Sequence, residues 1–151
     1  MNTVRTDEEA ALQHLLGAVE ESIAHMDDSA RHIEDPLVST TLCKLAARRK
    51  QHLPALKHEV RVRGDLPTAL DPERTGFQEI LQRATAMLSP ADSQTSHLRQ
   101  RIEGEEKLLE TIRGYIQLNW PADSKETLEE VAAHVQRCVV HLKEVADNLE
   151  S

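Results

Sequence analysis

Four side chains with metal-ligand chemistry and one cationic side chain are predicted to lie near the same bundle centre. His52, Glu105, Cys138 and His141 offer imidazole, carboxylate and thiolate groups, which are the ligand types of a mononuclear zinc site. The guanidinium of Arg49 would repel a cation bound there. The sequence therefore leaves two interpretations for these residues: a metal site that includes a repelling charge, or an ion pair.

Cys138 also has two interpretations. Beside His134 or His141 its thiol could be activated as a nucleophile, whereas on the inner stripe of a helix it is a small apolar core residue. We favour the core residue, and we interpret Cys43 in the same way. The sequence contains no Gly-rich phosphate loop, Walker sequence or nucleophile elbow, so no complete catalytic motif is present.

A polar row in the first predicted helix has the spacing of a ligand row, because residues i, i+4 and i+7 share one side of a helix. We interpret this row as a solvated face; it comprises Glu21, His25, Asp28 and His32. Glu20 and Asp27 lie at the edge of the apolar stripe and are better placed to reach inward.

Proline, glycine and capping residues divide the chain into predicted helices at residues 6–33, 36–63, 72–88, 90–118 and 121–150. Asp35 is a good N-cap residue and Pro36 suits the first helical position. Pro54 is expected to kink the second helix, because it frees the carbonyl group of Lys50 from its helical partner.

Four of these helices are long and amphipathic, which predicts an all-α, antiparallel four-helix bundle with a short extra helix at residues 72–88 between the second and third. The chain is expected to form one domain, residues 1–151. A turn of about 100° per residue gives apolar stripes from Leu12 to Ile33, Leu42 to Val60, Leu98 to Ile116 and Leu128 to Leu149.

Two opposite charges interrupt these stripes near mid-helix: Arg49 in the second and Glu105 in the third. An unpaired charge in the core would cost several kcal/mol of desolvation. We therefore predict that Arg49 and Glu105 form a buried ion pair.

Composition restricts the function. The net charge of −8 disfavours a general nucleic-acid or anionic-membrane binder. The chain has two cysteines without a CxxC pattern, no signal peptide and no apolar run of membrane-spanning length, which predicts a cytoplasmic protein. Seven basic residues cluster in the second helix: Lys44, Arg48, Arg49, Lys50, Lys57, Arg61 and Arg63.

Several short stretches resemble a family. They are residues 18–22 (AVEES), 63–67 (RGDLP) and 102–105 (IEGE), together with Tyr115 and the region of His141. On these stretches the chain resembles the ferritin-like superfamily, and within it an uncharacterised bacterial four-helix family. The resemblance covers nearly the whole chain and implies a di-iron site built from one Glu on each of two helices and a Glu-x-x-His on each of the other two.

Carried over to this chain, the di-iron ligand set is degenerate. Arg49 stands where the second helix should supply the Glu paired with His52, and Cys138 stands where the fourth helix should supply the Glu paired with His141. Glu105 and the two histidines remain, with Glu20 as a fourth candidate ligand. The charge of Arg49 could replace that of the iron.

The sequence therefore favours a non-catalytic ferritin-like bundle, a structural or protein-interaction module without cofactor. The alternative is a ferritin-like metal-binding protein, a di-iron oxidase or a metal store, with iron or zinc in a reduced ligand set. A third interpretation is a partner-binding protein whose basic second helix meets an acidic or phosphorylated target. Self-association is expected through the extra helix with Phe77 or the corner at Trp120, although both could pack within one chain.

Overall fold

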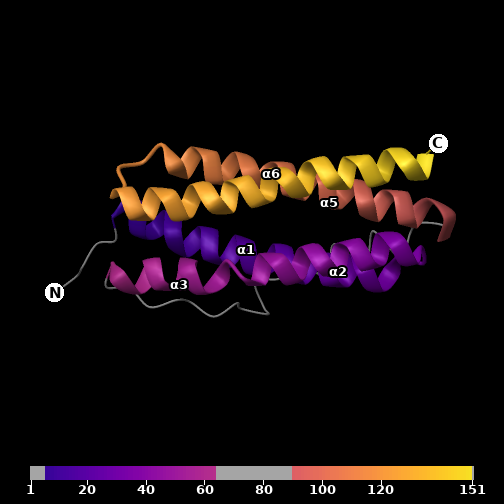
Figure 1. Ribbon diagram of the computed structural model, residues 1–151, viewed down its shortest axis with the longest axis horizontal. Helices are drawn as coiled ribbons and strands as arrows, with labels where there is room; N and C mark the ends of the chain where they lie inside the picture. The colour runs from indigo at the N-terminus through magenta and orange to yellow at the C-terminus, as the bar shows by residue number, and fades with distance from the viewer. Residues whose placement is uncertain (1–5, 64–89, 151) are drawn as a thin grey trace.

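The computed structural model describes residues 6–63 and 90–150, and all its regular elements in those ranges are α-helices (Figure 1). They are α1 (Asp7–His32), α2 (Pro36–Lys50), α3 (Leu53–Val62), α5 (Pro90–Ile116) and α6 (Ala122–Glu150). The all-α bundle expected from the sequence is confirmed in these ranges. The extra helix expected at residues 72–88 lies outside the described residues.

The first two helices begin at capping residues, and the cap predicted from the sequence, Asp35, is one of them. Thr6 accepts a hydrogen bond from the backbone N–H of Glu9 at 3.1 Å. Asp35 accepts hydrogen bonds from the backbone N–H groups of Leu37 and Val38, and Pro36 occupies the first turn of α2. Each cap satisfies donors that the helix itself leaves unpaired, which fixes where the helix starts.

The helix expected at residues 36–63 is divided into α2 and α3 by a turn at Gln51 and His52. Pro54 lies in the first turn of α3, where its missing N–H costs nothing. The N–H groups of Gln51 and His52 bond to carbonyls three residues earlier, which tightens the end of α2. The helical path is thus interrupted close to Pro54, as predicted. The interruption is a break between two helices and not a kink within one.

The helices pack as two hairpins. A short turn joins α1 to α2, and the Ser39 hydroxyl of α2 donates to the carbonyl oxygen of Ala30 in α1 at 2.8 Å. α5 and α6 form the second hairpin, and α1 also packs against α3 and α5. By contrast, α2 and α6 meet over only a short stretch. α3 and α6 meet no more closely, so the bundle is least closed on the side between α6 and the two helices α2 and α3.

The core follows the predicted stripes closely. Every stripe residue of α1 is buried, as are Leu42, Leu56 and Leu142 on other helices. Leu149 is an exception at 37% exposure, because it lies in the last turn of α6 beside a surface cavity. No helix in the described part of the chain is long and apolar enough to cross a membrane.

Side chains at the corner between α5 and α6 contact the neighbouring helices. Trp120 donates its indole N–H to the carbonyl oxygen of Tyr115 at 2.6 Å, and the guanidinium of Arg63 lies 4.9 Å from the indole ring centroid. Ser124 donates to Glu59 of α3 at 2.6 Å. Of the two roles left open for Trp120, these contacts correspond to packing within one chain.

Candidate functional site

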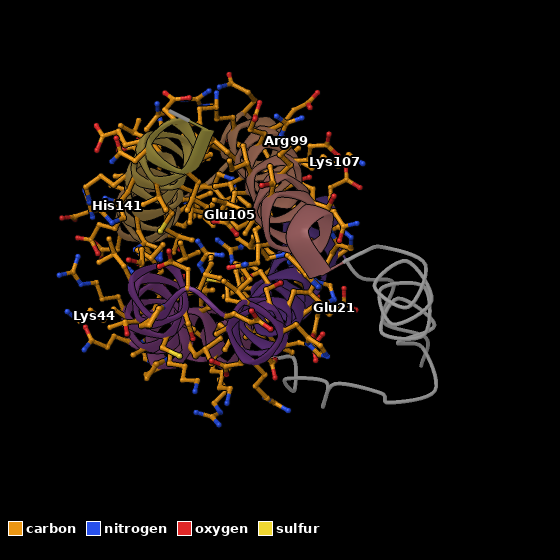
Figure 2. The ribbon with its side chains drawn as sticks, turned by 90° about the vertical axis from the view of Figure 1, so that its right-hand side faces the viewer. Glu21, Lys44, Arg99, Glu105, Lys107 and His141 are labelled. Atoms are coloured by element: carbon orange, nitrogen blue, oxygen red, sulfur yellow. The ribbon has the colours of Figure 1, made fainter. Side chains whose placement is uncertain are left out.

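The centre of the bundle holds the predicted ion pair between Arg49 of α2 and Glu105 of α5. Arg49 is 0% exposed and Glu105 is 2% exposed. The Nη1 group of Arg49 donates to Oε1 of Glu105 at 2.6 Å, and its Nη2 group donates to Oε2. Figure 2 shows Glu105 directed into the interior of the bundle, between the helices. The pair predicted from the sequence is present, and both carboxylate oxygens are engaged.

Two further side chains complete the coordination of the guanidinium. Nη1 of Arg49 also donates to the hydroxyl of Ser22 in α1 at 3.0 Å, and Nε donates to Nε2 of His134 in α6 at 3.2 Å. The Ser22 hydroxyl donates its own proton to the carbonyl oxygen of Val19, which leaves its lone pairs free to accept from Arg49. Arg49 of α2 therefore forms hydrogen bonds with side chains of α1, α5 and α6.

The charge of Arg49 is retained despite its burial. Desolvation opposes the charged form, but the hydrogen bonds and the negative charge of Glu105 outweigh it, so the pKa of Arg49 is raised above its usual value. The site is thus a true ion pair with no net charge, and it fixes α2 against α5 in one register.

His134 is a neutral ring in this environment. Burial first, and then the charge of Arg49, lower the pKa of His134 to about 3. Because Nε2 accepts from Arg49, the ring carries its proton on Nδ1. The His52 ring lies 4.8 Å from the His134 ring between centroids, and burial also lowers the pKa of His52. Neither His52 nor His134 carries charge at neutral pH.

Cys138 lies beside this histidine as a protonated thiol. Its Sγ atom is 3.6 Å from Nε2 of His134, and the residue is almost fully buried. Burial raises the pKa of the Cys138 thiol, and the nearby charge of Arg49 only partly offsets this. Since the reactive form of cysteine is the thiolate, this geometry suits a core residue. Cys43 is exposed on α2, so its interpretation as a core residue was wrong.

The alternative metal-ligand set is not assembled. Within residues 6–63 and 90–150, no three His, Cys, Asp or Glu side chains converge on a point that could hold an ion. Both oxygens of Glu105 accept from Arg49, His141 is exposed, and Glu20 is only half-buried. In the part of the chain that the structure describes, Glu20, His52, Glu105, Cys138 and His141 are therefore not gathered around one point.

The polar row of α1 corrects a second expectation. His25 is only 6% exposed, because α5 packs against this side of α1 and brings Arg101 towards it. Burial first, and then the charge of Arg101, lower the pKa of His25 to about 4. The His32 ring stacks on His97 of α5 with centroids 5.6 Å apart. The interpretation of this row as a solvated face was wrong for His25.

Two contributors were missed in the sequence, the half-buried Ser22 and the buried Arg101. Serine carries no marker that separates a core hydroxyl from a surface one. For Arg101 a signal was available: it precedes Glu105 by four residues and so shares its side of α5. Gly104 accommodates the Arg101 side chain, whose Nη1 lies 3.9 Å from the point where a Cβ atom would stand.

Comparison with models of known protein families gives no match to this chain, and no curated protein is similar to it at a significant level.

Proposed function

We propose that this chain is a non-catalytic, ferritin-like helical bundle that acts as a structural or protein-interaction module. One observation carries the proposal: the guanidinium of Arg49, fully buried, occupies both oxygens of Glu105 at the bundle centre. A ferritin-like relative would use such an inward carboxylate to hold iron. Here the cation is covalently part of the chain.

Electrostatics argue against a metal beside this pair. A divalent ion close to Arg49 would meet a like charge in a weakly screened interior, where such repulsion is strong. It would also have to take Glu105 from a bidentate contact, leaving the guanidinium buried without its counter-charge. Iron or zinc binding by a reduced ligand set therefore requires disassembly of the existing contacts.

The same cluster supports the absence of catalysis. A nucleophilic thiol needs a lowered pKa and a base with a free lone pair. Cys138 has a raised pKa, and the Nε2 lone pair of His134 already accepts a hydrogen bond from Arg49. Cytoplasmic location and self-association also belong to the proposal and rest on the sequence.

Metal content separates this proposal from the metal-binding alternative. The protein is purified without chelators, incubated with ferrous iron or zinc, desalted and measured by plasma mass spectrometry. We expect far less than one ion per chain, and no change in His52→Ala compared with the control His58→Ala on the exposed side of α3. Near-stoichiometric metal that disappears in His52→Ala but persists in the control would overturn the proposal.

A further inference from the structure

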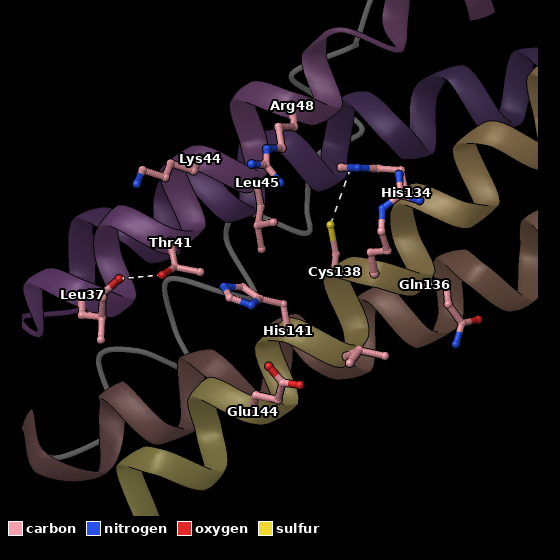
Figure 3. Close-up of a pocket in the computed structure, with 12 residues that line it drawn as sticks. Leu37, Thr41, Lys44, Leu45, Arg48, His134, Gln136, Cys138, His141 and Glu144 are labelled. Atoms are coloured by element: carbon pink, nitrogen blue, oxygen red, sulfur yellow. Dashed lines mark hydrogen bonds between the residues drawn. The ribbon is translucent and has the colours of Figure 1, made fainter.

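An open groove separates α2 from α6 on the loosely packed side of the bundle (Figure 3). It has a volume of about 630 Å³, within the range of pockets that hold small organic ligands. Two positions lie deep in it, Cys138 and His134, although both side chains are almost fully buried. The groove therefore leads from the surface to the polar centre of the molecule.

The walls of the groove combine apolar and cationic side chains. Leu37 and Val140 line it and are unusually exposed for apolar residues, at 72% and 48%, and the buried Leu45 adds to this surface. Figure 3 shows Leu45 and His141 directed into the space between the two helices.

Charge in the groove opposes the charge of the whole chain. Lys44, Arg48 and Arg137 line it, against one carboxylate, Glu144. The four formal charges sum to 3 − 1 = +2, in a protein of net charge −8. Because α2 and α6 run in opposite directions, Leu37 lies near the Glu144 end, and Arg48 lies near the His134 end. The groove thus has a cationic end at Arg48, and its other end combines the apolar Leu37 with the carboxylate of Glu144.

These features select a slim ligand with an anionic head. α2 and α6 approach within 8 Å between Cα atoms at some positions, whereas a helix with its side chains is about 10–12 Å across. A partner helix therefore does not fit between α2 and α6 where they approach, which favours a slimmer ligand such as an extended alkyl chain.

We propose that the groove between α2 and α6 binds a small anionic amphiphile, with a carboxylate or similar head at Arg48 and Arg137 and an apolar tail along Leu45, Leu37 and Val140. This inference goes beyond the proposed function and does not depend on it, since neither the ion pair of Arg49 nor the metal content enters the argument.

Calorimetric titration with decanoate, below the concentration at which it forms micelles, tests the proposal. We expect one decanoate per chain, with 1-decanol and acetate each binding at least tenfold more weakly because one lacks the charge and the other the tail. Removing one cation by Arg48→Gln or Arg137→Gln should weaken decanoate binding about tenfold, the usual worth of a hydrogen bond to a charged group. Arg61→Gln, a charge-matched control on an exposed part of α3 outside the groove, should leave it unchanged.

Two bulky variants locate the ligand. Thr41→Trp and Val140→Trp each place a ring in the groove from a different helix, and circular dichroism confirms that at least one folds. A folded groove-filling variant should abolish decanoate binding. The proposal is overturned if decanoate does not bind, if 1-decanol binds equally well, if the groove variants bind as the parent does, or if an acidic amphipathic peptide binds where decanoate does not.

Discussion

Glu105→Gln tests whether the central ion pair governs the stability of this bundle. The substitution keeps the size and shape of the side chain and one acceptor oxygen, but it replaces the second acceptor with an amide N–H. That N–H faces Nη2 of Arg49, so two donors meet where an ion pair stood. The guanidinium, 0% exposed, is then left without a counter-charge.

The magnitude follows from what remains bound to Arg49. Removing one partner of a buried pair typically costs about 3–5 kcal/mol, because the other charge stays buried. Ser22 and His134 still accept from Arg49, and the glutamine oxygen retains one contact. We therefore expect the free energy of unfolding to fall by about 3 kcal/mol.

Urea denaturation followed by circular dichroism measures this loss, and Glu106→Gln provides the matched control one residue further along α5. Glu106 forms an ion pair with Lys143 at 3.7 Å, but both side chains are about half exposed. A pair of that kind contributes about 0–1 kcal/mol. Equal and small effects of the two substitutions, with unchanged denaturant slopes, would refute the reasoning.

Three further outcomes follow from the buried polar groups. Lowering the pH from 6.5 to 4.5 should reduce the free energy of unfolding by about 1–2 kcal/mol for each of His25 and His134. The unfolded rings take up protons near pH 6.5, whereas the folded rings do so only near pH 4 for His25 and pH 3 for His134. Urea titrations at each pH should therefore give a flatter profile of stability against pH for His25→Gln than for the parent protein. Ser22→Ala should lower the free energy of unfolding by about 1–2 kcal/mol, since it leaves an N–H of Arg49 unpaired. Ser29→Ala should lower it by less than about 0.5 kcal/mol, because the buried Ser29 hydroxyl has no partner among the described residues. Equal losses of stability in thermal melts of the two variants would contradict this. Asp35→Ala should lower stability by about 1 kcal/mol through loss of the α2 cap, and no change in the melting temperature would argue against it.

Among the described residues, local signals in the sequence were sufficient to place the helices, apart from the division of one into α2 and α3, and to pair the two central charges. Asp35 and Pro36 act through their own backbone, and so does Pro54, so their effects could be predicted without knowledge of the neighbours. Arg49 and Glu105 could be paired because each interrupts an apolar stripe. An inward charge needs a partner, and the bundle offered one of opposite sign.

Contacts that depend on which helix lies beside which could not be predicted in the same way. His25 lies outside the apolar stripe of α1 and becomes buried because α5 covers that flank. Ser22 contributes through the position of α2, which brings Arg49 within 3.0 Å of it. Periodicity gives the centre of a buried face, but the width of that face is decided by two neighbouring helices.

Burial and positive charge together connect the separate properties of the centre. Arg49 and Arg101 are both buried cations, and both are influenced by the one carboxylate of Glu105. Burial first, and then the charge of one guanidinium, keep each of His25 and His134 neutral. The charge of Arg49 also opposes entry of a metal cation beside it. Replacing Arg49 should therefore change the proton affinity of His134 and the metal affinity of the centre together, whereas a purely steric core would change neither.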